Sequence, residues 1–123
     1  MSLLYSSEGY YCEGEPGSNW RFEMTSGEII LTDAKLSLVK KSDISLTEIG
    51  TSVDKLREDF KIPLTKIEKA YSINNGKIHF VVVETKDNYK FTLTMADEEN
   101  YGKKKSIELS ELITVSVLKN KIN

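Results

Sequence analysis

The sequence contains very few of the residues on which catalysis and metal binding usually depend. Its 123 residues include one cysteine, Cys12, and one histidine, His79. A single cysteine excludes an internal disulfide and is typical of a reducing compartment, so we expect a cytoplasmic protein. A nucleophilic Cys12 would need His79 as its base, and no second histidine is present to complete a metal site. We therefore predict no enzymatic activity, no metal and no cofactor.

Long apolar stretches are absent as well. No run approaches the roughly 20 apolar residues of a membrane-spanning helix. Leu3 and Leu4 stand without the basic and apolar regions of a secretory leader. We expect neither a span nor a leader. With 39% hydrophobic and 29% charged residues, the composition is typical of a soluble globular protein, and the length predicts one domain.

The chain also lacks an excess of positive charge. Its formal net charge is −2, and of the 17 basic residues only Arg21 and Arg57 are arginines. Because arginine is the preferred residue for bidentate phosphate recognition, we expect no nucleic-acid partner. The acidic run from Asp97 to Glu99 lacks the ligand spacing of a calcium loop, and the glycines form no phosphate-binding pattern. The candidate contacts for an anionic partner are two short lysine runs: Lys40, Lys41, Lys103, Lys104 and Lys105.

What the sequence does contain is β-strand pattern, clearest from Lys61 to Met95. Apolar residues occupy alternate positions in two runs, which are joined by turn residues that include Asn75 and Gly76. Alternation places one face of each strand against a core, and Asn-Gly is the preferred pair of a type I′ hairpin turn. The apolar positions are Ile67, Tyr71, Ile73, Ile78, Phe80, Val82, Tyr89, Phe91, Leu93 and Met95. Because Val81 and Val83 are apolar too, we predict that their strand is central and covered on both faces.

The preceding residues divide into an arm and the start of the main domain. Residues 1–19 mix aromatic and acidic side chains with turn formers, which predicts an N-terminal arm with a short strand near 10–13. A single domain is predicted over residues 20–123. Its first strands are expected at Trp20 to Met24, Glu28 to Thr32 and Leu36 to Leu38. In the first of these the alternating apolar residues are Trp20, Phe22 and Met24.

The periodicity changes between residues 42 and 60. This segment is polar with scattered apolar residues, and Val53, Leu56 and Phe60 follow the spacing of one helix face. We predict a short helical insertion between two strands. It would cover a sheet edge or barrel mouth, or contact a partner.

The C-terminal segment, residues 106–119, has two interpretations. Leu109, Leu112 and Ile113 share one face at helical spacing, which favours a closing amphipathic helix. The run from Ile113 to Leu118 also has β-branched residues at alternate positions, so a strand is the alternative.

Two segments resemble a known family. Residues 27–38 read Gly-Glu-Ile-Ile-Leu-Thr-Asp-Ala-Lys-Leu-Ser-Leu, and residues 62–67 read Ile-Pro-Leu-Thr-Lys-Ile. Both are similar to strands of GRAM and related pleckstrin-homology-like domains, and the resemblance extends over residues 20–118. It implies a mainly β (α+β) fold: a seven-stranded, strongly bent antiparallel sheet or partly open barrel, capped by a C-terminal helix. The insertion at 42–60 departs from a short domain of this type.

The resemblance also implies a class of function. Members of the family are usually non-enzymatic modules that bind membrane lipids, peptides or partner domains. Phosphoinositide-binding members carry a basic cluster near the first hairpin, where this chain has only Arg21 beside Glu23 and Glu28. We therefore expect a cytoplasmic module that binds a protein or peptide through an edge strand, the insertion or the groove beside the last helix. The alternatives are peripheral binding to anionic membranes through the lysines, and a small barrel that binds a hydrophobic ligand. An open edge strand also permits a homodimer.

Overall fold

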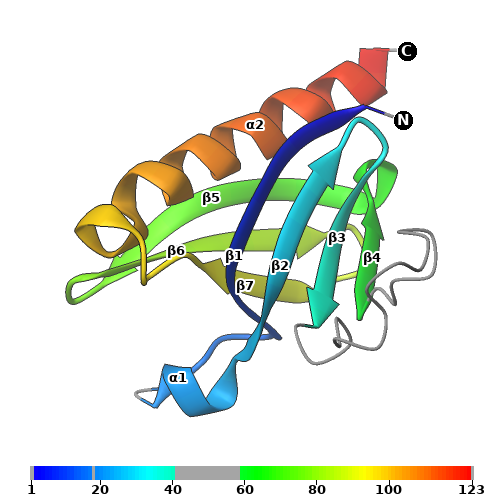
Figure 1. Cartoon of the computed structure of the whole chain (residues 1–123). Helices are drawn as coiled ribbons and strands as arrows, with labels where there is room; N and C mark the ends of the chain where they lie inside the picture. Colours follow the sequence, from blue (N-terminus) through cyan, green and yellow to red (C-terminus); the bar gives the residue numbers. More distant parts are fainter. Residues whose placement is uncertain (1, 18, 41–58, 123) are drawn as a thin grey trace, which may run out of the picture.

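The computed structural model describes residues 2–17, 19–40 and 59–122. They form a mainly β fold, a seven-stranded antiparallel sheet with a C-terminal helix (Figure 1). The strands are β1 (Leu3–Glu13), β2 (Thr25–Thr32), β3 (Lys35–Lys40), β4 (Phe60–Pro63), β5 (Ile67–Asn75), β6 (Ile78–Thr85) and β7 (Lys90–Thr94). The helices are α1 (Trp20–Glu23), α2 (Lys103–Ile122) and two short 3-10 helices, Leu64–Lys66 and Glu99–Gly102. The strand order is β4-β3-β2-β1-β7-β6-β5, and within the described residues neither outer strand has a second neighbour, so the sheet is not closed.

The first strand, β1, lies at the centre of this sheet. One half of the sheet, β2 to β4, lies on one side of it, and the other half, β5 to β7, lies on the other side. Strand β1 pairs with β2 from Leu3 to Tyr11 and with β7 from Tyr10 to Glu13. In Figure 1 it curves between these two stretches, and the strands of the two halves cross each other steeply. The sequence predicted only a short strand near 10–13. That length is wrong because small residues, Ser7 and Gly9, occupy the inward positions before Tyr11 and conceal the alternation.

Two glycines face each other where β1 curves. Gly9 pairs with Gly27 in the β1–β2 ladder. A Cβ atom on Gly9 would lie 2.6 Å from the carbonyl oxygen of Thr94, and one on Gly27 would collide with the carbonyl oxygen of Val39. Because neither position has room for a side chain, neighbouring backbones approach closely at this point of the sheet.

The hydrophobic core lies between the sheet and α2. The helix contributes Leu109, Ile113 and Val117, which repeat every four residues and so lie on one face. The sheet contributes fully buried residues from both halves, including Tyr11, Ile29, Leu31, Leu36, Leu38, Ile67, Val81 and Leu93. Each such aliphatic side chain stabilises the fold by about 1.5–3 kcal/mol relative to an exposed one. The predicted C-terminal helix is therefore confirmed, and the strand alternative is wrong.

A bulge near the start of β5 changes which of its side chains face the core. The pairing with β6 shifts between Ile67 and Lys69. Ile67 is fully buried in the core, but after the bulge Ala70 takes the inward position. The prediction that Ile67, Tyr71 and Ile73 share a face is therefore wrong, because one extra residue reverses the facing of everything that follows it.

In β6 both faces are covered, as predicted. Val81 and Val83 belong to the core cluster, while Phe80 and Val82 are buried on the opposite face. The turn before this strand differs from the prediction by one residue. Asn75 pairs with Ile78, and the turn consists of Gly76 and Lys77. Within the turn only Gly76 has a positive φ, 64°, which is the requirement of a type II′ turn rather than type I′.

Two further predictions concern residues 20–24 and 42–60. The expected strand over 20–24 is wrong: Trp20–Glu23 form the short helix α1, Met24 is buried, and Phe22 is 92% exposed. The predicted helical insertion at 42–60 lies outside the described residues except for its last two. Of these, Phe60 begins β4 instead of belonging to a helix.

Candidate functional site

The two outer strands of the sheet differ in how well their open edges are protected. Strand β4 has four residues, and among them are Lys61 and Pro63. Short length, lysine and proline are the usual devices that prevent an edge from pairing with another chain. Strand β5 has nine residues, and its only charged residues are Glu68 and Lys69 near its start. The edge of β5 therefore lacks these devices over most of its length.

The hairpin fixes which backbone groups of β5 face this open edge. A two-residue turn closes on a pair that exchanges backbone hydrogen bonds, here Asn75 and Ile78, and such pairs alternate along the ladder. It follows that Ala70, Ser72 and Asn74 direct their N–H and C=O groups away from β6. The Thr114 hydroxyl in α2 donates its shorter hydrogen bond, 2.8 Å, to the Ser110 carbonyl and lies 3.3 Å from the Ala70 carbonyl oxygen. This approach of α2 to the Ala70 carbonyl agrees with the assignment.

A groove runs between the open edge of β5 and helix α2. Its volume is about 460 Å³. The residues that line it are Ala70, Tyr71, Ser72, Ser110, Glu111, Thr114 and Val115. On the solvent side of α2, Val115 and Leu118 are 48% and 52% exposed. Open backbone groups, a groove and the exposed apolar side chain of Val115 thus occur together beside one strand, which is what an extended peptide segment needs.

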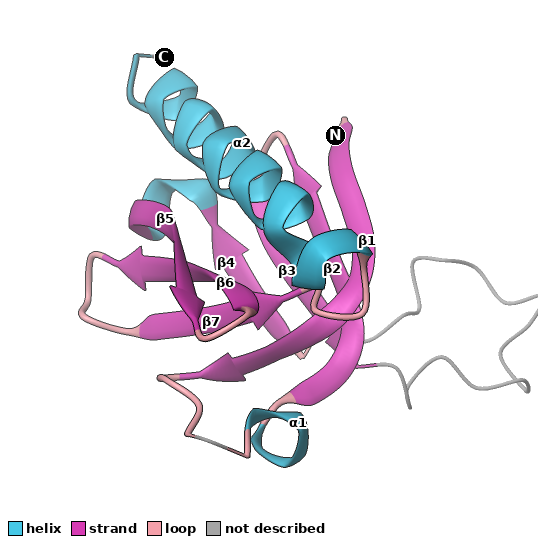
Figure 2. Cartoon of the chain, turned by 90° about the vertical axis from the view of Figure 1, so that its left-hand side faces the viewer, coloured by secondary structure: helices cyan, strands magenta, loops and turns pink. Residues whose placement is uncertain are grey.

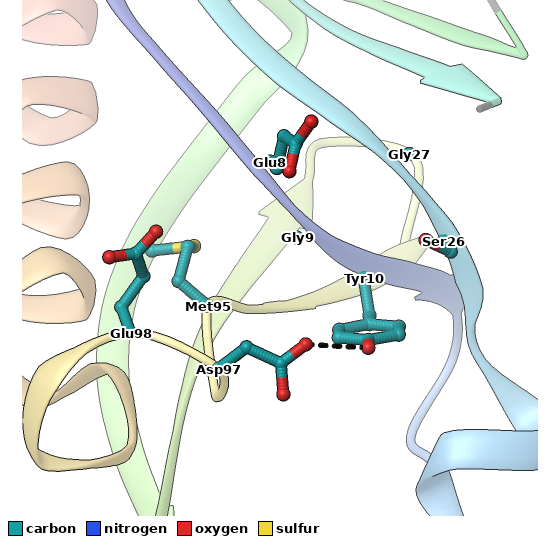
Figure 3. Close-up of a pocket in the computed structure, with 8 residues that line it drawn as sticks. All are labelled: Glu8, Gly9, Tyr10, Ser26, Gly27, Met95, Asp97 and Glu98. Atoms are coloured by element: carbon teal, nitrogen blue, oxygen red, sulfur yellow. Dashed lines mark hydrogen bonds between the residues drawn. The ribbon is translucent and has the colours of Figure 1, made fainter.

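A second hollow, of about 100 Å³, lies where β1 passes from β2 to β7 (Figure 3). Gly9, Gly27, Met95 and Tyr10 are among the residues that line it. The acidic side chains around it are Glu8, Asp97 and Glu98.

Polar side chains at this second hollow bond to one another and connect parts of the fold. The Tyr10 hydroxyl donates a 2.7 Å hydrogen bond to Asp97, and the Arg21 guanidinium forms a 3.1 Å ion pair with the same carboxylate. The hydrogen bond from Tyr10, supported by Arg21, holds the pKa of Asp97 below its ordinary value. The same hydrogen bond raises the pKa of Tyr10. These three side chains join β1, α1 and the segment after β7, so their polar groups are already partnered.

The short helix α1 is fixed to the sheet by its tryptophan. The Trp20 ring packs edge-to-face on Tyr10 and on Phe80, with centroid distances of 5.4 and 6.1 Å. The Arg21 guanidinium lies 4.5 Å from the centre of the Trp20 ring. Figure 2 shows α1 and α2 at opposite ends of the sheet. Trp20 therefore covers Phe80 of β6, whose partner in β5 is Ile73, and it is not among the residues that line the β5 groove.

The lysines predicted to contact an anionic partner do not form one cluster. Lys40 is exposed at the end of β3, and Lys41 lies outside the described residues. Lys103 and Lys104 are exposed in the first turn of α2, which Figure 1 places well away from the end of β3. Lys105 pairs with Glu98 at 3.1 Å, so part of the charge in that run is neutralised.

The two residues considered for catalysis lie in β1 and β6. Burial, reinforced by the charge of Glu23, raises the pKa of the Cys12 thiol, which disfavours the reactive thiolate. The backbone carbonyl of His79 accepts hydrogen bonds from Thr94 at 2.7 Å and Ser106 at 3.4 Å. In the described ranges, no three His, Cys, Asp or Glu side chains are placed to hold a metal ion.

The sequence predicted a site at an edge strand or the groove beside the last helix, but not the residues that form it. It missed Ser72, Thr114 and Val115, since serine and threonine in a strand or helix carry no functional signal of their own. It also missed the contact of Tyr10 with Arg21 and Asp97. The only available signal was the position of Asp97 directly after a predicted strand.

Comparisons with known proteins add no assignment. Neither the models of protein families nor the curated proteins match this chain. Among the helices that the structure describes, none has the length and apolar character needed to cross a bilayer.

Proposed function

We propose that this chain is a non-enzymatic interaction module that docks an extended segment of another polypeptide along β5, beside α2. The observation that carries the proposal is the unprotected edge of β5, where Ser72 and Asn74 direct backbone groups toward an open groove. Exposed strand edges of this length are usually blunted, as β4 is, unless a partner pairs with them.

The fold supports a pleckstrin-homology-like assignment for the module. The support is the seven antiparallel strands, whose two halves cross steeply, and the terminal helix, since the resemblance implies a bent seven-stranded sheet capped by such a helix. Modules of this family are usually non-enzymatic and bind membrane lipids, peptides or partner domains. The assignment agrees with the partnered or structural roles of Cys12, His79 and the carboxylates near Tyr10.

Docking would proceed by strand addition. Backbone groups of the partner would bond to the outward groups of Ser72 and Asn74, which gives affinity independent of sequence. Alternate side chains of the partner would enter the groove against Thr114 and Val115, which gives specificity. Two alternatives remain predictions: binding to anionic membranes through the lysines, and binding of a hydrophobic ligand in the interior. No feature of the described residues favours either alternative over strand addition.

A pair of substitutions at Ser72 tests the proposal. Ser72→Pro removes the outward N–H without breaking a bond to β6, because that N–H faces away from the sheet. Ser72→Ala removes the hydroxyl and keeps the N–H. Peptides selected from a displayed random library would be titrated against both variants and the unsubstituted chain, with circular dichroism as the check on folding.

We expect Ser72→Pro to weaken binding about tenfold or more and Ser72→Ala to leave it nearly unchanged, since one lost backbone hydrogen bond with a buried unpaired partner costs about 1–3 kcal/mol. Amide hydrogen exchange should slow at Ser72 and Asn74 on binding. Selected peptides that bind both variants equally, or that protect another surface, would overturn the proposal.

A further inference from the structure

We propose that the strand docked on β5 is the β5 strand of a second copy of this chain, in an antiparallel pair whose two-fold axis passes midway between the two Ser72 residues. This inference rests on the proposed function, because it names the partner of the same edge. Its basis is that β5 is complementary to itself in one particular register.

The regular part of β5 defines that register. Between the bulge and the turn, uninterrupted pairing with β6 extends from Lys69 to Asn75, and Ser72 is its middle residue. In an antiparallel pair, outward-facing residues must lie opposite outward-facing residues. An axis midway between the two Ser72 residues satisfies this requirement over the whole regular stretch. Ser72 lies opposite Ser72 of the second copy, and Ala70 lies opposite Asn74 of the second copy.

Charge is also compatible with this register. The charged residues Glu68 and Lys69 lie near the start of β5. With the axis at Ser72, Lys69 faces Asn75 of the other copy and Glu68 faces Gly76. Like charges directly opposite each other destabilise a sheet, and this arrangement contains none.

Apolar residues meet on the outer face of the same pair. Tyr71 lies opposite Ile73 of the second copy, and this contact occurs twice because of the symmetry. Ile73 is 39% exposed in the single chain. Aromatic and β-branched residues in opposed positions stabilise a sheet. Moving the axis by one residue in either direction replaces these contacts with Tyr71 against itself or Ile73 against itself and shortens the matched stretch.

The inner side of the docked strand fits the groove. There β5 presents Ala70, Ser72 and Asn74, which are small or short side chains. The groove between β5 and α2 has a volume of about 460 Å³ and includes Val115, which is 48% exposed. A strand with small inward side chains can lie in this groove beside the helix, so each copy would fill the groove of the other.

Disulfide trapping provides a specific test of the register. In a Cys12→Ser background, Ser72→Cys places the two thiols opposite each other across the axis. The expected Cα separation is about 5.5 Å, within the roughly 4.4–6.8 Å range of disulfides. Asn74→Cys is the matched control, since its two copies would be about 13 Å apart along the strands. We expect mild oxidation to cross-link the first variant at least tenfold faster than the second.

The molecular mass of the protein in solution tests whether the dimer forms. Light scattering over a range of concentrations should show a dimer that dissociates on dilution. Ser72→Ala should keep the dimer. Ser72→Pro should raise at least tenfold the protein concentration at which half of the dimer has dissociated. Equal cross-linking of both cysteine variants, or a monomer at every concentration, would overturn the inference.

The two proposals can fail separately. A monomer that still binds displayed peptides through the Ser72 N–H would overturn the dimer and leave the docking function in place. If Ser72→Pro changes neither dimerisation nor peptide binding, both proposals are wrong.

Discussion

The Tyr10 hydroxyl donates a 2.7 Å hydrogen bond to Asp97, a residue 87 positions later in the chain. The bond lowers the pKa of Asp97 from its ordinary 3.8. A carboxyl whose pKa is lowered by folding stabilises the folded state when ionised, and this contribution disappears as the pH falls through the folded pKa.

Asp97→Asn should therefore destabilise the fold at neutral pH and have little effect in acid. Because Asp97 is largely exposed, we expect a loss of about 0.5–1 kcal/mol at pH 7. The difference from the unsubstituted chain should shrink below pH 3.8 as the carboxyl is protonated. Urea unfolding between pH 7 and pH values below 3.8 measures this difference in stability, and Glu13→Gln at an exposed position is the control. A loss that is independent of pH would contradict the role given to the charge.

The packing of α1 predicts opposite outcomes for two neighbouring aromatic residues. Trp20→Ala removes edge contacts with Tyr10 and Phe80 and should cost about 2 kcal/mol. Phe22→Ala removes a side chain that is 92% exposed and should change stability by less than about 0.5 kcal/mol. Thermal unfolding of both variants tests this, and equal losses would show that α1 is not held by its tryptophan.

A similar pair on α2 tests which helix face packs on the sheet. Ile113 is fully buried, so Ile113→Ala should cost about 2–5 kcal/mol. Val115→Ala lies at the groove and should change the stability of the monomer by less than about 0.5 kcal/mol. Denaturant unfolding at a low protein concentration, where any dimer is dissociated, gives both values. A large loss for Val115→Ala would place that residue in the core.

The close approach at the facing glycines predicts a strong effect of one methyl group. Gly27→Ala should destabilise the fold by about 1–3 kcal/mol, because its Cβ would collide with the Val39 carbonyl oxygen. Ser26→Ala, at the exposed neighbouring position, should be nearly neutral. Unfolding midpoints of the two variants compare them directly. A neutral Gly27→Ala would mean that β2 and β3 can separate at this point without cost.

The sequence predicted much of the fold because alternation in β2, β3, β6 and β7 is regular. It failed at residues 20–24 for a geometric reason. Trp20 and Met24, four residues apart, share a face in a helix as well as in a strand, so only Phe22 distinguishes the two structures. In the structure Phe22 points to solvent, as the helix requires.

The errors in β5 and β1 have different causes. A bulge is one unpaired residue with no signature in the sequence, and it reversed the facing of Tyr71 and Ile73. In β1 the inward position Gly9 has no side chain because the Thr94 backbone approaches it, and that approach is visible only in three dimensions. The sequence predicted where the candidate site lies, next to the last helix. It could not predict the backbone groups of Ser72 and Asn74 that form the site, because their direction depends on the pairing of the whole hairpin.

The central position of β1 has a consequence for how the protein is made. Thr92 in the last strand hydrogen-bonds to the Gly14 carbonyl, 78 residues earlier. During synthesis β1 leaves the ribosome well before β7, so one edge of β1 has no partner until β7 has been made. Closing so long a loop is entropically costly, so folding should be slow. Until it is complete, the nascent chain carries an unpaired central strand that a chaperone or a misplaced strand could occupy.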